Sequence, residues 1–348
     1  MTAGETSVAP KRARQSYFLR LALIALVGLL GYSLWVSGVF RRAPRIGFVT
    51  ASADKFWDPV IVGAQAAAKD YRAVLIVRKP SKGEGEQSAM ISELLKEKVD
   101  GLAISPLNAE SQAGLLSDVA ADTHLVTVDS DCQVFNRLCF VGTDNYGAGR
   151  DCGQLIKMAV PQGGRVIISI GSLSKENGQR RRQGLIDELL DRELMPNRPM
   201  DPVSGELKGS KYTVLTTLVD EAGAEEAAQL ATDAIKAHPD VDCFACLYGY
   251  STPAVLGVLK QTGKLGKIQL VGFDTLDETL DGIDSGNVFG TIVQNQYRYG
   301  YESVRILAAA ARGEKRAGMP AHPTLSFSCQ VLTKSSLEDF RKQQQETP

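Results

Sequence analysis

The 348-residue sequence is poor in histidine, in cysteine and in net charge. Its three histidines leave little material for histidine-based metal or acid–base sites. Six cysteines in a chain of this length are too few for a disulfide scaffold. Lys and Arg number 39 against 40 for Asp and Glu, so the chain lacks the basic excess typical of nucleic-acid-binding proteins.

Several enzyme signatures are absent as well. The chain has no Gly-x-Ser-x-Gly nucleophile elbow, no phosphate-binding P-loop, and no Gly-x-Gly-x-x-Gly after the first predicted strand. His124 starts a predicted strand, His238 ends a predicted helix and His322 lies in a predicted loop, so none is placed as a general base. We therefore predict no enzyme, no cofactor and no metal site.

One segment departs sharply from the average composition. Leu21–Phe40 is a run of twenty residues without a charge, flanked by basic residues on both sides. As a helix it would span about 30 Å, the thickness of the hydrocarbon core of a bilayer. We predict a basic cytoplasmic N-region (1–20) and a transmembrane signal-anchor (21–40), with a cleaved signal peptide as the alternative. The rest of the chain would then be periplasmic or otherwise extracytoplasmic, and tethered to the cytoplasmic membrane.

From Arg45 onward, short apolar runs alternate with amphipathic runs of helical length, twice over. This pattern predicts an α/β protein with two doubly wound parallel-sheet lobes, whose sheets carry helices on both faces. Strands are predicted at Arg45–Val49, Ala73–Val77, Gly101–Ile104, Leu125–Val128, Arg165–Ile170, Tyr212–Thr216, Cys243–Leu247, Ile268–Val271, Val288–Val293 and near Leu325–Leu332. The predicted helices lie between them, and the last, Tyr297–Ala311, precedes the final strand.

Polar and aromatic residues follow several of these strands. In open parallel sheets, ligands bind at the carboxyl ends of the strands, so these residues are the candidate site. They include carboxylates, an arginine and two adjacent aromatic rings: Thr50, Asp54, Phe56, Trp57, Asp129, Arg181, Ser251, Asp274 and Gln294. A sugar suits this set, because its hydroxyls form hydrogen bonds with carboxylates and arginine while its C–H face stacks on aromatic rings.

At these same residues the sequence resembles periplasmic sugar-binding proteins of the ribose-binding type, which share their fold with the ligand-binding part of lactose-repressor-like regulators. The resemblance runs from about Arg45 to Leu332 and rests on motifs in the family's order. These are Phe56-Trp57 with Gly63-Ala64-Gln65, Val126-Thr127-Val128-Asp129, Gly142-Thr143-Asp144-Asn145, Arg181 three residues before Gly184, Ala237-His238-Pro239-Asp240-Val241, Val271-Gly272-Phe273-Asp274 and Thr291-Ile292-Val293-Gln294.

The resemblance implies a role for each candidate residue. Phe56 and Trp57 would sandwich the sugar, Asp54, Asp129 and Asp274 would accept from its hydroxyls, and Arg181 would be the main donor. Gln294 would lie at the hinge, and Thr50 and Ser251 would be further contacts. The implied lobes comprise residues 45–145 plus 295–325 and residues 146–294 plus 326–340, joined by a three-crossover hinge. Residues 341–348 are expected to be a frayed tail.

The expected function is that of a binding protein that closes its lobes around a monosaccharide-like ligand and delivers it to an ABC transporter. The alternative is a ligand-sensing protein for a sensor kinase or chemoreceptor, with a sugar, polyol or autoinducer as ligand. As an enzyme alternative, Asp129 and Asp274 could serve a glycosidase, which needs two carboxylates about 5–10 Å apart across a cleft. No nucleic-acid partner is expected, because a membrane segment occupies the place of a DNA-binding helix-turn-helix.

The cysteines suggest one structural feature. Cys132 and Cys139 bracket a six-residue loop close to Asp129. In an oxidising compartment they could form a local disulfide, and two separate thiols are the alternative. Cys243 and Cys246 match Cys-x-x-Cys, but strand periodicity would point them to opposite faces, which argues against redox or zinc chemistry.

Overall fold

The structure is a computed structural model, and it describes residues 20–29, 42–134, 136–221, 223–314 and 323–346. The chain divides into two compact units, residues 1–43 and residues 44–348. In the first unit, residues 20–29 are helical and expose apolar side chains such as Leu21 and Ile24. Within the described ranges, no helix has both the length and the apolarity needed to cross a membrane. Residues 30–40 of the predicted signal-anchor lie outside those ranges.

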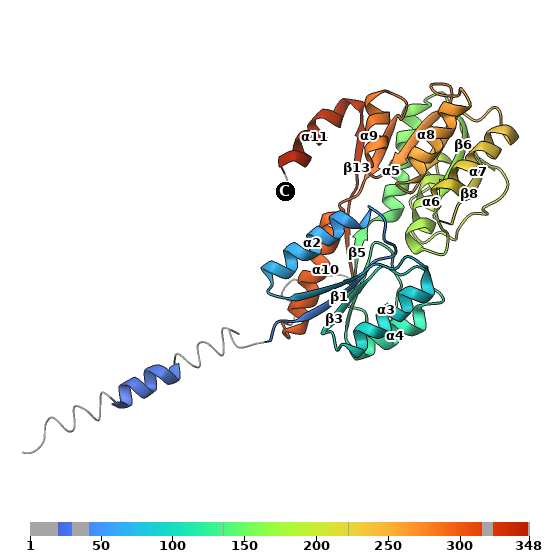
Figure 1. Ribbon diagram of the computed structural model, residues 1–348. Coiled ribbons are helices and arrows are strands. Elements are labelled where there is room, and N and C mark those ends of the chain that lie inside the picture. The colour runs from blue at the N-terminus through green and yellow to red at the C-terminus, as the bar shows by residue number, and fades with distance from the viewer. Residues whose placement is uncertain (1–19, 30–41, 135, 222, 315–322, 347–348) are drawn as a thin grey trace, which may run out of the picture. The chain divides into compact units, whose positions relative to one another are not determined.

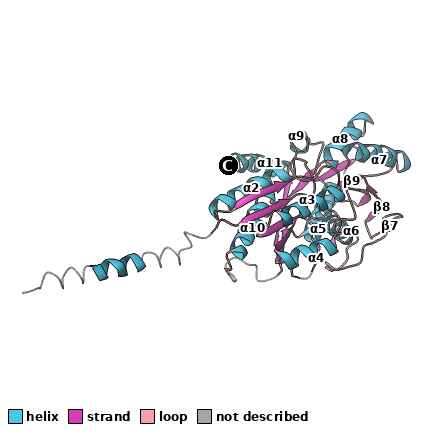
Figure 2. Ribbon diagram, turned by 60° about the horizontal axis from the view of Figure 1, so that its bottom comes forward, coloured by secondary structure: helices cyan, strands magenta, loops and turns pink. Residues whose placement is uncertain are grey.

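The N-lobe is built on a six-stranded sheet in the order β12-β5-β4-β3-β1-β2, with all neighbours parallel. Helices α2 and α10 cover one face and α3 and α4 the other, and each face buries its own hydrophobic cluster (Figures 1 and 2). The elements are β1 (Arg45–Val49), α2 (Trp57–Asp70), β2 (Val74–Arg78), α3 (Glu84–Lys96), β3 (Gly101–Ile104), α4 (Ala113–Asp122), β4 (His124–Val128), β5 (Cys139–Thr143), α10 (Gln296–Ala311) and β12 (Thr324–Phe327).

The C-lobe is built on a seven-stranded sheet in the order β13-β11-β10-β9-β6-β8-β7, with antiparallel strands only at its two edges. Helices α5 and α6 cover one face, and α7, α8 and α9 cover the other. The elements are α5 (Asn145–Ala159), β6 (Gly164–Ile170), α6 (Glu176–Leu189), β7 (Leu207–Lys208), β8 (Tyr212–Val219), α7 (Ala224–Ala237), β9 (Cys243–Cys246), α8 (Ser251–Gln261), β10 (Gln269–Phe273), α9 (Asp277–Asp284), β11 (Gly290–Val293), β13 (Gln330–Thr333) and α11 (Leu337–Glu346).

The two sheets repeat one strand order. Strands β1 to β5 of the N-lobe correspond in position to β6, β8, β9, β10 and β11 of the C-lobe, and β12 and β13 occupy equivalent edges. Among the described elements, the chain passes between the sheets after β5, after β11 and after β12. As the strand–helix alternation predicted, the chain forms a two-sheet α/β fold with mostly parallel strands.

Glycines allow α10 and α5, the helices that begin where the chain passes from one lobe to the other, to pack closely against α2 and α6. A methyl group on Gly63 of α2 or on Gly300 of α10 would overlap a backbone carbonyl oxygen of the facing helix. Gly149 of α5 and Gly184 of α6 face each other in the same way in the C-lobe. Each lobe therefore uses a reciprocal glycine contact to fix a crossover helix against the helix that follows its first strand.

The structure corrects several details of the sequence prediction. The last predicted strand, Leu325–Leu332, is two strands in different sheets, β12 and β13. The pattern missed β5 and α5, which form the first passage between the lobes. The tail predicted to be frayed from residue 341 is helical to Glu346, because Phe340 is buried in the C-lobe core and Arg341 pairs with α9.

The cysteine prediction is also corrected, because Cys132 and Cys139 are free thiols in the structure. Cys132 packs with α3 and α4 and donates to the carbonyl oxygen of Ala109, whereas Cys139 packs in the cluster beneath α2 and α10. Burial raises the pKa of the Cys139 thiol to about 12. The two side chains serve separate apolar clusters, as do those of Cys243 and Cys246.

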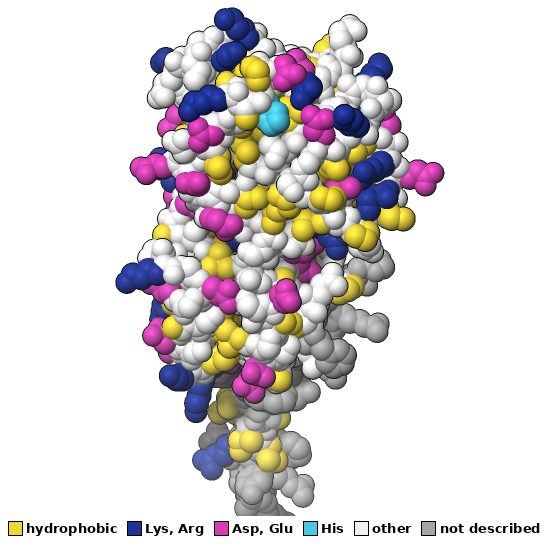
Figure 3. Space-filling view, turned by 90° about the vertical axis from the view of Figure 1, so that its right-hand side faces the viewer, with side chains coloured by type: hydrophobic (Ala, Val, Ile, Leu, Met, Phe, Trp, Pro, Cys, Tyr) yellow, Lys and Arg dark blue, Asp and Glu magenta, His cyan; other side chains and the backbone are white. Residues whose placement is uncertain are grey.

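The acidic and basic side chains of the surface are intermixed. On the face shown in Figure 3, groups of both signs alternate with hydrophobic side chains, and neither sign forms a large continuous area. This distribution agrees with the near-zero net charge of the chain. A one-sign surface of the kind that attracts nucleic acid is not visible on this face.

The glycine contact between α2 and α10 gives a stability prediction. Gly300→Ala should force the two helices apart and destabilise the protein by about 3 kcal/mol, a fall in Tm of about 6 °C. Gly257→Ala in α8 is the matched control, because apart from its chain neighbours and the backbone of its own helix no atom lies within 4 Å of the added methyl group. It should stabilise by up to about 1 kcal/mol through helix propensity. Equal Tm values for the two variants in thermal unfolding would contradict the packing role of Gly300.

Candidate functional site

Two aspartates occupy equivalent positions at the carboxyl ends of equivalent strands. Asp129 follows β4 in the N-lobe and Asp274 follows β10 in the C-lobe, and both have a φ of 62°. Their backbone N–H groups donate to Val141 and Ile292, which lie on the next strand of each sheet. A left-handed backbone costs a residue other than glycine about 1–2 kcal/mol, and such strain is concentrated at functional sites. The same conformation recurs at the equivalent strand end of each lobe, so the two carboxylates are the leading candidates for site residues.

Arg181 lies between the two aspartates and is buried. Its Nη2 is 3.9 Å from Oδ1 of Asp129 and donates at 2.7 Å to Oε1 of Gln294. Gln294 in turn donates through Nε2 to Oδ1 of Asp274 at 2.8 Å. Nε of Arg181 donates to Asn145, the first residue of α5. The guanidinium thus connects a carboxylate of each lobe with residues of two passages between the lobes.

Aromatic rings and hydroxyls complete this part of the site. The guanidinium of Arg181 lies 4.9 Å from the ring centre of Phe273 and 5.9 Å from that of Tyr248. Thr143 donates to Oε1 of Gln294 at 3.1 Å and also forms a short hydrogen bond with Tyr299. These contacts hold Arg181 and Gln294 in fixed positions.

The N-lobe residues predicted for the site differ in their exposure and in the hydrogen bonds that they already form. Thr50 is fully buried and donates to the carbonyl oxygen of Ser52, so its hydroxyl is already engaged. Asp54 is exposed and accepts from Ser52 and from the backbone of Phe56. Trp57 is 2% exposed within the N-lobe core, and its rings lie edge-on to the half-buried ring of Phe56. Of the two aromatic residues, Phe56 has the more accessible ring.

The structure adds three residues that the sequence reasoning missed. Asn177 of α6 donates at 3.0 Å to Oδ2 of Asp129, and Ser105, just after β3, donates to the same oxygen at 3.4 Å. The charge of Lys175, just before α6, acts on both Asp129 and Asp54. Ser105 is the first residue after β3, so the rule that residues after strands form the site would have found it. Lys175 and Asn177 lie at a helix start, where no comparable signal exists.

Ser251 was predicted as a contact and lies at the start of α8. It is fully buried, and among the described residues its Oγ has no hydrogen-bond partner. Its backbone N–H donates to the carbonyl oxygen of Tyr248. A buried hydroxyl without a partner carries a desolvation cost that a ligand or a water molecule can relieve.

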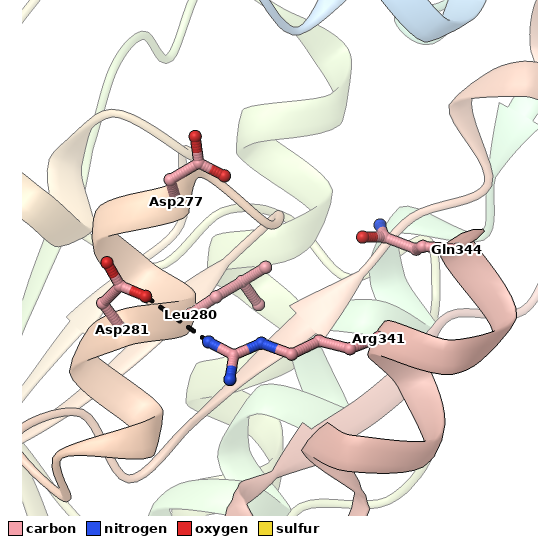
Figure 4. Close-up of a pocket in the computed structure, with 5 residues that line it drawn as sticks. All are labelled: Asp277, Leu280, Asp281, Arg341 and Gln344. Carbon is pink, nitrogen blue, oxygen red and sulfur yellow. Dashed lines mark hydrogen bonds and ion pairs between the residues drawn. The ribbon is translucent and has the colours of Figure 1, made fainter.

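A separate pocket of about 410 Å³ lies between α9 and α11 (Figure 4). Its lining includes Asp281, paired with Arg341, and Gln344, which faces the ion pair from α11. No predicted site residue lines it. One wall of this pocket is formed by α11, in the stretch that the sequence predicted to be a frayed tail.

A family profile described as "Periplasmic binding protein domain" matches residues 46–315. The chain belongs to the periplasmic binding protein family. It is 23% identical over 318 residues to the D-allose-binding periplasmic protein of Escherichia coli (strain K12), with 87% of this chain and 96% of that protein covered.

Solved structures show the same fold. GanP, a glucose-galactose binding protein from Geobacillus stearothermophilus, has a TM-score of 0.76 at 24% identity, with 85% of this chain and 99% of that chain covered. A structure of the XylFII-LytSN complex gives 0.73 at 22% identity, with 84% and 99% covered. This periplasmic binding protein is therefore of the ribose-binding type, as its motifs predicted, and its relatives are binding proteins.

The two carboxylates of this periplasmic binding protein are costly to ionise. Burial raises the pKa of Asp274 to about 6, although Arg181 and the bond from Gln294 act to lower it. Burial also raises the pKa of Asp129, against the charges of Arg181 and Lys175. The folded protein therefore holds protons at these groups at a pH where the unfolded chain has released them.

This shift in the Asp274 pKa predicts a pH dependence of stability. Its folded pKa of about 6 exceeds the ordinary value of 3.8, so the free energy of unfolding should fall as pH rises through this window and stay low above it. The fall should be about 3 kcal/mol at most. In Asp274→Asn, which cannot ionise, urea unfolding at pH 4.5 and 7.5 should show a smaller fall than in the wild type. The control is Asp233→Asn, at an exposed helix position, which should keep the wild-type difference between the two pH values. A wild-type pH dependence in Asp274→Asn would contradict this assignment.

Proposed function

We propose that this protein binds a monosaccharide-like ligand between its two lobes. The observation that supports the proposal is a pair of buried aspartates, Asp129 and Asp274, with Arg181 between them. Both aspartates have a left-handed backbone conformation. Each carboxylate keeps one oxygen in contact with side-chain amides: Oδ2 of Asp129 accepts from Asn177, and Oδ1 of Asp274 accepts from Gln294. The remaining oxygen of each can accept from a hydroxyl.

The charges of the site favour a neutral polyhydroxylated ligand. The charge of Arg181 opposes those of Asp129 and Asp274, and Lys175 further opposes that of Asp129, so a ligand without net charge adds no new buried charge to the site. Phe56 supplies a half-buried ring for the C–H face of a sugar. D-allose and glucose or galactose are the ligands named for the similar proteins, and a polyol or autoinducer with comparable hydroxyls is the alternative.

Binding rather than catalysis is the role that we propose for the two aspartates. A glycosidase would need one carboxyl free to protonate a leaving group and the other free to attack or to activate water. Here Asp129 and Asp274 are each held by amide donors, and the relatives are binding proteins. We therefore assign no enzymatic activity to the site.

We propose delivery to an ABC transporter as the step that follows lobe closure. A sensor kinase or chemoreceptor is the second candidate partner, because one structure with this fold is a complex, XylFII-LytSN. We also propose that residues 21–40 anchor the protein to the membrane with the binding lobes outside the cytoplasm. Tethering would raise the effective concentration of the binding protein at its membrane partner. Neighbouring genes for an ATPase and a permease would favour transport, and a kinase gene would favour sensing.

Sugar binding is tested by titration calorimetry with D-allose, D-ribose, D-glucose, D-galactose, D-arabinose and xylitol. We expect at least one of them to bind, and Asp129→Asn and Asp274→Asn each to weaken that binding about 10- to 150-fold at pH 7.5. Each lost charged hydrogen bond is worth about 1.5–3 kcal/mol. The exposed-site variant Asp233→Asn should bind as the wild type does. Wild-type affinity in both site variants would remove these aspartates from the site.

Membrane anchoring has its own test. In cells that express the full chain, the protein should stay in the membrane pellet after carbonate extraction and should keep its original N-terminus. Replacing Leu26 and Leu30 by Arg should release it, because a charge at the centre of a bilayer costs about 2.5 kcal/mol or more per residue. A soluble wild-type protein whose N-terminus lies beyond residue 21 would instead identify a cleaved signal peptide.

A further inference from the structure

Asn177 joins the two lobes by a direct hydrogen bond at the site. It lies in the first turn of α6 in the C-lobe, is 3% exposed, and donates from Nδ2 at 3.0 Å to Oδ2 of Asp129 in the N-lobe. The neighbouring Ser174 also reaches the N-lobe, where it donates to the carbonyl oxygen of Leu107 at 3.3 Å. The start of α6 is therefore fastened to two loops of the other lobe.

The orientation of the Asn177 amide is fixed by a second bond. Its Oδ1 accepts from the hydroxyl of Tyr248 at 3.3 Å, so its Nδ2 faces Asp129. Tyr248 is itself positioned against the guanidinium of Arg181. An amide held at both ends costs little further entropy when it donates to a carboxylate, and a hydrogen bond to an ionised group is about twice as strong as a neutral one.

Because Asn177 bonds to only one oxygen of Asp129, the two carboxylate oxygens have different partners. Oδ2 accepts from Asn177 and from Ser105, whereas Oδ1 faces Arg181 at the longer distance of 3.9 Å. We propose that Asn177 is a positioning residue that fastens α6 to Asp129 across the lobes and leaves Oδ1 as the oxygen that accepts a ligand hydroxyl. The ligand part of this inference rests on the proposed function, and the cross-lobe bond does not.

Asn177→Asp is the informative variant, because it places a second carboxyl where the amide donates. Two carboxyls at about 3 Å cannot both ionise, so the pair shares one proton at low pH and repels once that proton is lost. The other charged groups that act on Asp129 include Arg181 of α6, Lys175 before α6, Asp54 after β1 and Asp274 after β10. Tyr248 and Tyr299 also interact with it, but burial raises the pKa of both phenols, so they stay protonated between pH 5 and pH 8. Because these groups are present in every variant, the pH dependence of the wild type measures the effect of their own titration.

The matched control is Gln179→Glu, two residues further along the same helix. It makes the same change from amide to carboxyl, but the Gln179 amide donates to Leu173 within the C-lobe and not to Asp129. Any general effect of a new carboxyl in the first turn of α6 therefore appears in both variants. Only Asn177→Asp should respond to pH through Asp129.

The experiment uses the full chain purified in detergent. With the sugar that binds the wild type, Asn177→Asp should bind at pH 5 within a few-fold of the wild type and lose about 10- to 100-fold in affinity at pH 8, beyond any loss in Gln179→Glu. Asn177→Ala should weaken binding about 10-fold at both pH values. Tighter binding by Asn177→Ala would mean that Asn177 competes with the ligand for Asp129, and would overturn the proposal.

A second arm needs no ligand. Without sugar, the Tm of Asn177→Asp should fall between pH 5 and pH 8 by several degrees more than that of Gln179→Glu, because the repelling carboxyls push the lobes apart. Equal pH dependence of the two variants, without sugar, would overturn the cross-lobe role of Asn177. If the wild type binds none of the sugars, the proposed function falls, while this arm still decides whether Asn177 fastens the lobes through Asp129.

Discussion

The site depends on one electrostatic constraint, the burial of two carboxylates around a single guanidinium. Asp129 and Asp274 come from different lobes, and without Arg181 each would be a buried charge with little compensation. Gln294 extends the reach of the arginine, because it accepts from Arg181 on one side and donates to Asp274 on the other. The position of Arg181 in turn depends on α6, which the contact between Gly149 and Gly184 holds against α5. Helix packing and charge placement are therefore parts of the same arrangement.

The two lobes place their carboxylates by the same backbone device. In each sheet, the residue after the fourth strand in the repeated order turns into the left-handed region, and its N–H still donates to the next strand. Aspartate tolerates this conformation better than most residues because its short polar side chain can form local hydrogen bonds. Thr291 further secures the turn in the C-lobe by donating to the carbonyl oxygen of Asp274. The strain is thus met by hydrogen bonds in the surrounding sheet, and the carboxylate stays in place.

The sequence was sufficient for features that depend on periodicity and on strand ends, and insufficient for those that depend on long-range contacts. Strand–helix alternation predicted two parallel-sheet lobes, and the strand-end rule led to Asp129 and Asp274. The run Leu325–Leu332 read as one strand, because sheet membership is decided by the partners, Phe140 for Thr324 and Val293 for Gln330. Asn177 was missed because its role comes from Asp129, 48 positions away in the chain. The spacing of Cys132 and Cys139 suggested a bond, but could not show that the two side chains pack in different apolar clusters.

The raised pKa values of the two carboxyl groups and the opposing charge of Arg181 both bear on the charge that a ligand of this site should carry. A protonated Asp274 is a poor acceptor for a sugar hydroxyl, whereas an ionised one is a strong acceptor. A neutral ligand that donates hydroxyls to Asp129 and Asp274 therefore stabilises their charged forms and lowers both pKa values. Binding and deprotonation of Asp274 are linked, because each makes the other more favourable. A positively charged ligand would compensate the carboxylates directly but would bring its charge close to Arg181, which has no acceptor of its own to offer. The physical chemistry of the site thus favours a ligand that brings donors without charge, and hydroxyl groups on a ring provide this.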